Sequence, residues 1–426
     1  MRLCEVGIGC DGLRVIWRTI VCCGFLSALA LAGEGEWTEF RGPTGQGLAE
    51  AGPSAWGVKK GVVWKTPLPG KGWSSPVMSG GRIALTAAKL VDGKTVLAVM
   101  AVDAESGKVL WEKDVFRPTA GEVAKCHAKN SLASATPVIV GETLYVHFGH
   151  MGTAAMELAS GTVIWKRDLE YDPMHGSGSS PVVVDGKLVF HMDGDDQAAI
   201  RALDAKTGKD AWMTPRNEDV KRSFSFCTPL LVNIDGRRQL VSVASGMVGG
   251  YAPEDGTLLW KVRFDEGFSV IPRPVTADGM VYVATGFMKP KLLGIKLGGA
   301  KGDVTQSHVA WEVEKNMPKT PSVVAKDGVV YVLADNGMVS CLNGKSGEVR
   351  WQEKLLGNFS ASPLLAGETL YCMTEDGACY VLKVSPQSGK VVFEIEMEER
   401  IFASPMVVDG MLYLRTEEAL WKIGAS

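Results

Sequence analysis

The sequence has little net charge and no run of basic residues. Its 426 residues include 45 Lys and Arg against 48 Asp and Glu, so the formal net charge is -3. Nucleic acids are bound through clustered Lys and Arg side chains that meet the phosphates. The composition therefore gives no reason to expect a nucleic-acid partner.

The sequence motifs of several enzyme classes are missing as well. We find no nucleophile elbow of the hydrolases, no glycine-rich phosphate loop and no His-Glu-x-x-His zinc motif. Each of these motifs places a reactive group on a defined local structure, so their absence removes the sequence support for those chemistries. No catalytic residue is predicted, and a non-catalytic role is favoured.

Apolar runs are short. The run from Thr19 to Leu31 has thirteen residues, whereas a helix needs roughly 20 to cross a bilayer. Arg14 and Arg18 precede it, and Ala30-Leu31-Ala32 forms a small-x-small cleavage site. We expect residues 1–32 to be a signal peptide and the protein to be exported, either periplasmic or secreted, with no transmembrane segment after signal removal.

Cysteine is scarce beyond this segment. Five remain in the expected mature chain, and an odd number excludes complete internal pairing. Cys372 and Cys379 flank a tight turn at Glu375–Gly377, where a disulfide is possible but two small buried thiols are favoured. The only adjacent cysteines, Cys22 and Cys23, fall within the expected signal.

Histidine is also rare, and its distribution suggests a metal site only weakly. Five of the six histidines fall within two consecutive repeats, near the acidic segment Asp193–Asp196. Imidazole and carboxylate groups are common metal ligands. However, His147 and His150 need not share a face, and the acidic segment lacks the alternating pattern of a calcium loop. We therefore predict no metal site. The five histidines are His127, His147, His150, His175 and His191.

The sequence does contain an eightfold repeat. A Ser, Thr or Arg followed by Pro recurs at Pro76, Pro137, Pro181, Pro229, Pro274, Pro321, Pro363 and Pro405. An aromatic residue recurs with the same period at Trp64, Trp111, Trp165, Trp212, Trp260, Trp311, Trp351 and Phe393. Repeats of this length are typical of a β-propeller, in which each repeat forms one four-stranded sheet.

The repeat from Ser179 to Pro215 shows the pattern of one blade. Pro181 begins a short apolar strand, as suits a residue that cannot donate a ladder hydrogen bond. Asp185-Gly186 is the first hairpin turn of the repeat. Gly208 belongs to the third turn, where it can take a positive φ. Trp212 then lies on the outermost strand, where its ring can be buried against the neighbouring blade. We interpret the repeated aromatic residues as packing residues.

The two ends of the chain complement each other. The segments Met411–Arg415 and Ala419–Lys422 complete only three strands of the last repeat, while Val62–Thr66 is an outer strand without the three before it. Joining them closes the ring without an exposed edge. We predict an all-β fold: an eight-bladed β-propeller of four-stranded antiparallel blades in residues 62–426, preceded by an N-terminal extension in 33–61.

The pattern Ala-x-Asp-Ala-x-Thr-Gly-Lys-x-x-Trp at Ala202 to Trp212 resembles the repeat of pyrroloquinoline-quinone-type propellers. Quinoprotein alcohol dehydrogenases and the propeller lipoprotein of the outer-membrane protein assembly machine share this repeat. The chain also resembles the exported quinoprotein-like propellers of planctomycetes, in a likeness that includes the segments Trp37–Gly47 and Phe148–Thr153. This resemblance implies a fold and a compartment but no settled activity.

For a dehydrogenase, the resemblance would imply adjacent cysteines under the quinone, an acidic calcium shell and a catalytic Asp. The expected mature chain has no adjacent cysteines. Pyrroloquinoline quinone with calcium is therefore the alternative rather than the favoured cofactor, and a quinone-dependent oxidoreductase is the alternative to a protein without enzymatic activity.

In a propeller, the loops before the innermost strands meet at one mouth of the central channel. In this sequence those loops are rich in cations, amides and aromatic rings, which suit an anionic or polyhydroxylated ligand. The candidate ligand-binding residues are His127, Lys129, Asn130, His175, Arg222, Arg273 and Asn358.

The sequence thus favours an exported binding or scaffold propeller that acts through its channel mouth. Its partner is an unidentified small molecule, glycan or protein. The alternatives are a pyrroloquinoline-quinone-dependent dehydrogenase and a polysaccharide-binding protein.

Overall fold

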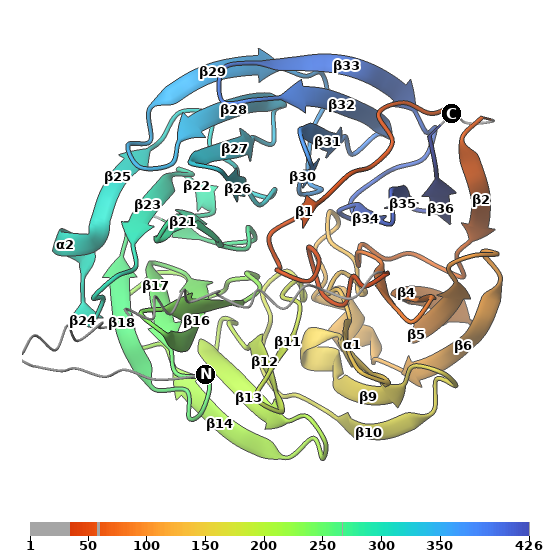
Figure 1. Cartoon of the computed structure of the whole chain (residues 1–426). Coiled ribbons are helices and arrows are strands. Elements are labelled where there is room, and N and C mark those ends of the chain that lie inside the picture. Colours follow the sequence, from red (N-terminus) through yellow and green to blue (C-terminus); the bar gives the residue numbers. More distant parts are fainter. Residues whose placement is uncertain (1–34, 58–59, 266, 426) are drawn as a thin grey trace, which may run out of the picture. The chain divides into compact units, whose positions relative to one another are not determined.

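The computed structural model describes residues 35–57, 60–265 and 267–425. The expected signal peptide, 1–32, lies outside them. Eight four-stranded antiparallel sheets surround a central axis (Figure 1), which confirms the predicted all-β propeller. Within each blade the chain runs from the axis to the rim, because consecutive strands are joined by short turns.

The strands of the first four blades follow the order of the chain from the axis outwards. They are β3 (Val77–Ser79), β4 (Arg82–Val91), β5 (Lys94–Asp103) and β6 (Val109–Phe116) in blade 1; β7 (Val138–Val140), β8 (Thr143–His147), β9 (Thr153–Glu157) and β10 (Val163–Arg167) in blade 2; β11 (Val182–Val184), β12 (Lys187–His191), β13 (Ala199–Asp204) and β14 (Asp210–Pro215) in blade 3; and β15 (Leu230–Ile234), β16 (Arg237–Ala244), β17 (Met247–Tyr251) and β18 (Leu258–Arg263) in blade 4.

The remaining blades follow the same order except for the last strand of blade 8. They are β20 (Val275–Ala277), β21 (Met280–Ala284), β23 (Leu292–Lys296) and β25 (Val309–Val313) in blade 5; β26 (Val324–Lys326), β27 (Val329–Leu333), β28 (Met338–Asn343) and β29 (Val349–Lys354) in blade 6; β30 (Leu364–Ala366), β31 (Thr369–Met373), β32 (Ala378–Val384) and β33 (Gly389–Glu396) in blade 7; and β34 (Met406–Val408), β35 (Met411–Arg415), β36 (Ala419–Ile423) and β2 (Val62–Pro67) in blade 8.

Several short elements lie outside the eight four-stranded blades. Two of them add a parallel strand to a blade, β1 (Leu48–Ala49) beside β30 and β24 (Gly302–Asp303) beside β18. A two-stranded ribbon and three short helical turns complete the described elements. They are β19 (Gly267–Phe268) with β22 (Phe287–Met288), α1 (Ala120–Ala124), α2 (Thr305–His308) and the 3₁₀ turn η1 (Gly149–Met151). None of the described helices is long and apolar enough to cross a bilayer.

Blade 8 is built from both ends of the chain. β2 pairs antiparallel with β36, with Val62 opposite Ile423 and Pro67 opposite Ala419. This pairing confirms the predicted closure and protects the edge of β36.

The residues before the innermost strands form a ring of hydrogen bonds around the axis. At seven of the eight steps, the hydroxyl of a Ser or Thr accepts the N–H of the equivalent residue in the preceding blade. This gives the Ser/Thr–Pro step a structural meaning, since one side chain joins two blades. The bonds run from Ser75 to Thr136, Thr136 to Ser180, Ser180 to Thr228, Arg273 to Ser322, Ser322 to Ser362, Ser362 to Ser404 and Ser404 to Ser75, at 2.9–3.1 Å.

Blade 6 departs from the predicted register. Ser322 provides the hydroxyl of the ring, and β26 begins two residues later at Val324. Val323 therefore stands where the other blades have proline. The assignment of Pro321 to the repeated position was wrong by two residues. Thr320-Pro321 matches the Ser/Thr-Pro pattern, but the equivalent residues of blade 6 are Ser322 and Val323, which follow directly.

The repeated tryptophans lock each blade to the next. The indole Nε1–H of each donates to a backbone carbonyl in the third turn of the following blade, and the ring covers the glycine of that turn. The donor and acceptor residues are Trp64 and Ala104, Trp111 and Leu158, Trp165 and Ala205, Trp212 and Pro253, Trp311 and Gly344, and Trp351 and Ser385. This confirms that they are packing residues.

Two aromatic positions differ in a way that the fold explains. Trp260 donates instead to Gln239 Oε1 within its own blade, whose outer edge is occupied by β24. Phe393 packs against Trp56 of the N-terminal extension, with ring centroids 5.1 Å apart.

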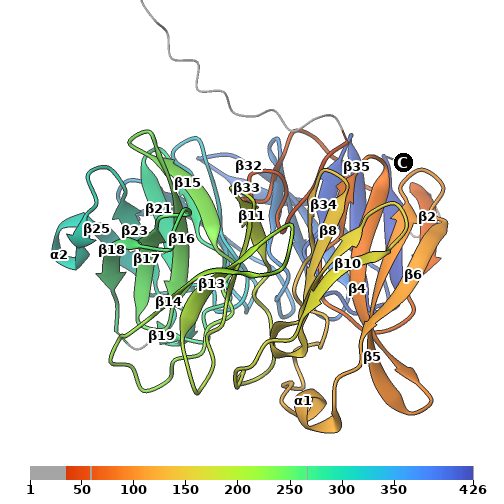
Figure 2. The same cartoon turned by 90° about the horizontal axis from the view of Figure 1, so that it is seen from below.

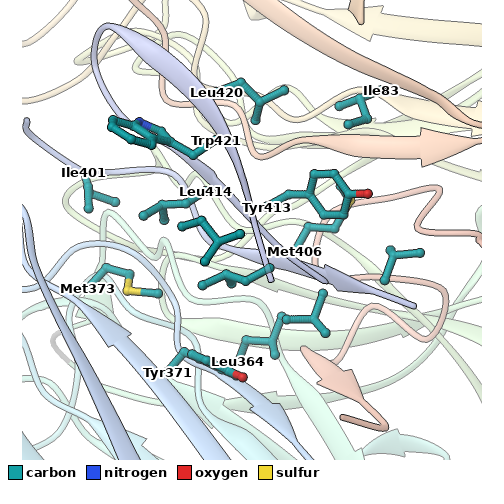
Figure 3. Packing of buried hydrophobic residues seen from close by; sticks show 14 of the residues in the cluster. Ile83, Leu364, Tyr371, Met373, Ile401, Met406, Tyr413, Leu414, Leu420 and Trp421 are labelled. Atoms are coloured by element: carbon teal, nitrogen blue, oxygen red, sulfur yellow. The ribbon is translucent and has the colours of Figure 1, made fainter. Parts of the chain in front are cut away.

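The largest buried cluster lies where the ring closes. Figure 3 shows Tyr371 and Met373 of blade 7, Leu414 and Trp421 of blade 8, and Ile83 of blade 1 packed together. Burial of this apolar surface holds the two chain ends in one core. The buried Cys372 and Cys379 are free thiols, as favoured from the sequence.

Candidate functional site

A cavity of about 560 Å³ opens at the mouth where the loops before the innermost strands meet. We call it the mouth cavity. All eight of those loops contribute to its wall, and its volume lies within the range of ligand pockets. Its lining includes Phe40, Trp73, Ser75, His127, Lys129, Asn130, Thr136, His175, Ser180, Arg222, Phe226, Phe268, Ile271, Phe287, Lys319, Ser322, Asp335, Ser360, Ser362, Phe402 and Ser404. Figure 2 shows α1 and the β4–β5 hairpin projecting together from one face of the ring.

The structure brings His127, Lys129, Asn130, His175 and Arg222 together at this cavity. The Asn130 amide holds the loop rather than facing a ligand. Its Nδ2 donates to His175 O and Ser177 O, at 3.0 and 3.1 Å. His127 and His175 meet edge to face, with centroids 5.1 Å apart. Partial burial and, to a smaller extent, His127 lower the pKa of His175, so this ring is neutral at pH 7.

Two candidate residues do not line the mouth cavity, contrary to their predicted place. Arg273 is 2% exposed. Its guanidinium donates to Pro229 O at 2.8 Å and to Phe40 O at 2.5 Å, and pairs with Glu39 at 3.1 Å. Asn358 is exposed on its loop but stands outside the wall.

Arg273 occupies the one position of the hydroxyl ring that has no hydroxyl. Its side chain cannot accept the N–H of Thr228, so it extends toward the chain that fills the channel. The sequence identified its repeat position correctly, but only the tertiary contacts show which way it points.

The N-terminal extension closes the channel below the mouth cavity. In Figure 1 the segment before β2 crosses the centre of the ring. It contacts several innermost strands, through Trp37 paired with Met78, Thr38 O accepting from Ile139 and β1 beside β30. Phe40 reaches the mouth cavity and forms its floor.

Glycines in this extension leave room for buried arginines. A Cβ on Gly45 would lie 2.4 Å from Arg273 Nη1, and a Cβ on Gly47 would lie 2.6 Å from Arg41 Nη2. Both glycines have a positive φ. Arg41 is 2% exposed and donates to Val323 O at 2.8 Å. The glycine-rich segment Trp37–Gly47 therefore forms the seal of the channel.

Cations stacked on aromatic rings surround the mouth. Arg222 lies 4.6 Å from the centroid of Phe268, Lys319 lies 5.2 Å from Phe287, and Arg400 lies 4.7 Å from Phe402. Trp73 stacks on Phe402 at 4.5 Å. Such pairs combine a fixed positive charge with an apolar surface.

Carboxylates at the mouth are already engaged. Lys129 Nζ pairs with Glu375 Oε1 at 2.7 Å, linking the loop before blade 2 to blade 7. Ser360 donates to the same oxygen at 2.6 Å. Asp335 Oδ2 accepts the backbone N–H of Lys319 at 2.6 Å. These contacts hold Glu375 and Asp335 in place at the mouth, and the charges of Lys129 and Glu375 offset each other.

Phe40, Phe226, Phe287 and Asp335 belong to the cavity but were not among the predicted site residues. Phe287 and Asp335 follow second strands rather than preceding first strands. Phe40 comes from outside the repeat. The only indication in the sequence that Phe40 could matter was that its segment, Trp37–Gly47, shares the resemblance to quinoprotein-like propellers.

A second polar cluster is buried where blades 3 and 4 meet. His191 Nε2 lies 2.6 Å from Ser242 Oγ, and His191 Nδ1 lies 3.6 Å from Asp193 Oδ2. This order of groups is that of a nucleophile, a base and an orienting acid. However, the three side chains are at most 3% exposed and Arg216 donates to Ser242 and Asp193. No substrate can reach this serine, so the cluster is structural.

The donor set of a calcium-bound quinone does not fit this chain. Over the described residues there is no group of three or more His, Cys, Asp or Glu side chains that could hold a metal ion. The five cysteines of the described residues are free, and none of them is adjacent to another. We therefore assign no step to that cofactor.

Comparison with known proteins places the repeats in a family. The family model described as outer membrane protein assembly factor BamB matches residues 54–190, 99–261 and 300–385. Outer membrane protein assembly factor BamB of Moranella endobia is 23% identical over 320 residues, covering 72% of this chain and 75% of the relative. The protein of the same name from Yersinia pestis is 23% identical over 390 residues, covering 84% and 91%.

Solved structures share the fold. BamB from Moraxella catarrhalis superposes with a TM-score of 0.61 and 15% identity, covering 85% of this chain and 97% of its own. Quinohemoprotein alcohol dehydrogenase from Comamonas testosteroni superposes with a TM-score of 0.56 and 12% identity, covering 92% and 81%. At such identities the likeness concerns the fold alone.

Proposed function

The chain belongs to the family of the outer membrane protein assembly factor BamB, and from this membership we propose that it is a non-catalytic scaffold outside the cytoplasm, which holds a partner protein at the mouth of its channel. Relatives with this name support a role in the assembly of outer membrane proteins.

The mouth cavity is the surface best suited to hold a partner. The mouth cavity is a blind cavity, because the extension seals the channel below it, and all eight loops form its wall. Loops held on a rigid ring are suited to binding. The buried Ser–His–Asp cluster is the only arrangement of catalytic type that we identify among the described residues, and it is inaccessible.

The test is genetic complementation in the host of the protein. Deleting the gene should lower the amounts of outer membrane proteins in the envelope. The unaltered gene should restore them, whereas a Trp73→Ala, Phe402→Ala double variant should not, because it removes the stacked rings of the mouth. A Lys345→Gln variant is the control. This exposed residue lies in the turn between β28 and β29, on the face opposite the mouth. Unchanged outer membrane proteins after deletion would refute the assembly role.

The alternative activity can be tested directly. A quinone-dependent dehydrogenase should bind pyrroloquinoline quinone with calcium, change its visible absorbance and reduce a dye when an alcohol is added. We expect none of these responses, because the described part of the chain lacks a set of side chains that could hold the calcium ion. Polysaccharide binding, the other alternative, predicts signals on a glycan array that Trp73→Ala abolishes. We favour a protein partner because the exposed rings are paired with cations.

A further inference from the structure

The cations of the mouth follow a regular arrangement. Lys129, Arg222, Lys319 and Arg400 lie on the loops before blades 2, 4, 6 and 8, so they alternate around the ring. The loops between them provide Trp73, His175 and Phe268, while Lys71 before blade 1 is paired with Glu417 and Arg273 before blade 5 is buried. Lys129, Arg222 and Lys319 line the mouth cavity, and Arg400 stands over Phe402 of its wall, so a chain segment that crosses the mouth meets a cation on either side.

Three of these four cations have no carboxylate partner. Within 35–57, 60–265 and 267–425, Arg222, Lys319 and Arg400 contact aromatic rings but form no ion pair. Stacking fixes each charge over a ring without neutralising it. An anionic group of a ligand can therefore bind there without displacing a carboxylate of this chain.

The centre of the mouth has a different chemistry. Phe40 forms the floor of the mouth cavity, and Phe226 and Ile271 contribute to its apolar wall. Ser and Thr side chains of the hydroxyl ring also face it, and these hydroxyls accept backbone N–H groups of the neighbouring blade. The apolar rings and the Ile271 side chain make the centre suited to a bulky apolar group.

On the basis of this arrangement, and resting on the proposed binding role, we propose that the mouth binds an extended segment of a partner protein in which one bulky apolar side chain is flanked by Asp or Glu. The apolar side chain enters the mouth cavity and contacts Phe40. The flanking carboxylates pair with Arg222 and Arg400, which lie before blades 4 and 8 on opposite sides of the ring. Lys319 contributes between them.

The test uses fluorescence anisotropy with the mature protein and labelled peptides blocked at both ends. The probe is a heptapeptide with a central Phe and two Asp or Glu residues on each side. We expect it to bind at low salt and to weaken as salt rises. Exchanging the central Phe for Ala should weaken binding at least tenfold, and exchanging the acidic residues for Lys should abolish it.

Variants of the protein assign the contacts. An Arg222→Gln, Arg400→Gln double variant should weaken binding of the acidic peptide at least tenfold, while Lys345→Gln should leave it unchanged. Thermal unfolding curves of the variants should match that of the parent, since the two arginines are exposed. Equal binding of the acidic and basic peptides would overturn the proposal, as would binding that is insensitive to the double variant.

The outcome also separates this inference from the proposed function. If the complementation test requires the mouth but the acidic peptides do not bind, only the ligand chemistry proposed here is wrong. If an aromatic carboxylate such as phenylacetate competes as well as the peptide does, the mouth recognises a small anion and the inference is overturned. If the mouth variants complement fully and no peptide binds, both proposals fail.

Discussion

At the scale of single residues, two buried cations show how the N-terminal extension is held. Arg41 and Arg273 are both 2% exposed, and each donates to backbone carbonyls across the channel. Burial and the nearby Arg273 lower the pKa of Arg41 to about 9. Such charges are tolerated only where hydrogen bonds replace water, and here the two arginines fix the position of Phe40.

Replacing Arg273 tests this anchor. Arg273→Ser supplies the missing hydroxyl of the ring, yet it leaves Phe40 O and the Glu39 carboxylate without their donor. We expect a net loss of about 2–3 kcal/mol in the free energy of unfolding, since hydrogen bonds to charged groups carry that much. Urea unfolding at pH 7 measures it. Arg222→Ser, at the exposed mouth, should cost less than about 0.5 kcal/mol. Equal losses would show that Arg273 is not an anchor.

Buried histidines make the fold sensitive to acid. Burial lowers the pKa of His147 to about 3 and holds that of His191 well below its usual range. The unfolded chain therefore takes up protons below about pH 6.5 while the folded chain does not, so stability falls as the pH falls from there toward 3. Asp193 acts in the opposite sense, because burial raises its pKa to about 7 despite Arg216.

The variant His147→Gln isolates one of these contributions. It retains a polar partner for Thr153, which lies 2.7 Å from His147 Nδ1, but cannot be protonated. Between pH 6.5 and 4.5 it should lose about 2 kcal/mol less stability than the parent, since each pKa unit is worth about 1.4 kcal/mol. Urea unfolding at several pH values gives this difference. Parallel stability curves for the two proteins would contradict the assignment.

At the scale of the element, the third turn of a blade and the tryptophan of the preceding blade act as one unit. The glycine of that turn adopts a positive φ and, having no side chain, leaves room for the indole ring. In blade 3, a Cβ on Gly208 would lie 2.7 Å from Trp165. The first turn of the same blade has Gly186 with nearly the same φ and open space around it.

These two glycines form a matched pair. Gly186→Ala should cost only the strain of a left-handed residue, about 1–2 kcal/mol. Gly208→Ala carries the same strain and also displaces Trp165, so it should cost about 1–3 kcal/mol more. Differential scanning calorimetry on both variants tests this. If the two variants have the same melting temperature, the contact between Trp165 and the Gly208 turn contributes nothing to stability.

At the scale of the whole molecule, blade 8 has the same four strands as the other blades because β2 covers the edge of β36. Repeat arrays gain stability from each interface between neighbours, and a closed ring has no weak terminal repeat. The same closure keeps the eight mouth loops at constant spacing, which any ligand that contacts several of them requires.

Two truncations separate the roles of β2 and the extension. A protein that begins at Leu68 lacks β2 and exposes the edge of β36, so we expect aggregation or loss of cooperative unfolding. A protein that begins at Val62 keeps β2 and should unfold cooperatively at a lower temperature, because only the seal of the channel is lost. Size-exclusion chromatography and calorimetry distinguish them. A cooperative transition in the shorter protein would disprove closure by β2.

The blade count and the closure could be predicted from the sequence because their determinants are local. A turn glycine, a strand-initiating proline and an outer tryptophan act within one repeat or its neighbour, and the repeat supplies eight copies of the evidence. The same logic located the loops that carry His127, Lys129, His175 and Arg222. Blade 6 shows its limit, since Pro321 fits the pattern but lies outside the register.

Only the tertiary structure decided what each loop residue faces. Side chains alternate between two directions along an extended chain, so a repeat position does not determine contact. Arg273 turned inward because Phe40, more than two hundred residues earlier, reaches it. Asn358 lies on a mouth loop but outside the wall, and Phe40 and Phe287 enter the cavity from segments outside those loops. These contacts join distant parts of the chain, and no local pattern of residues specifies them.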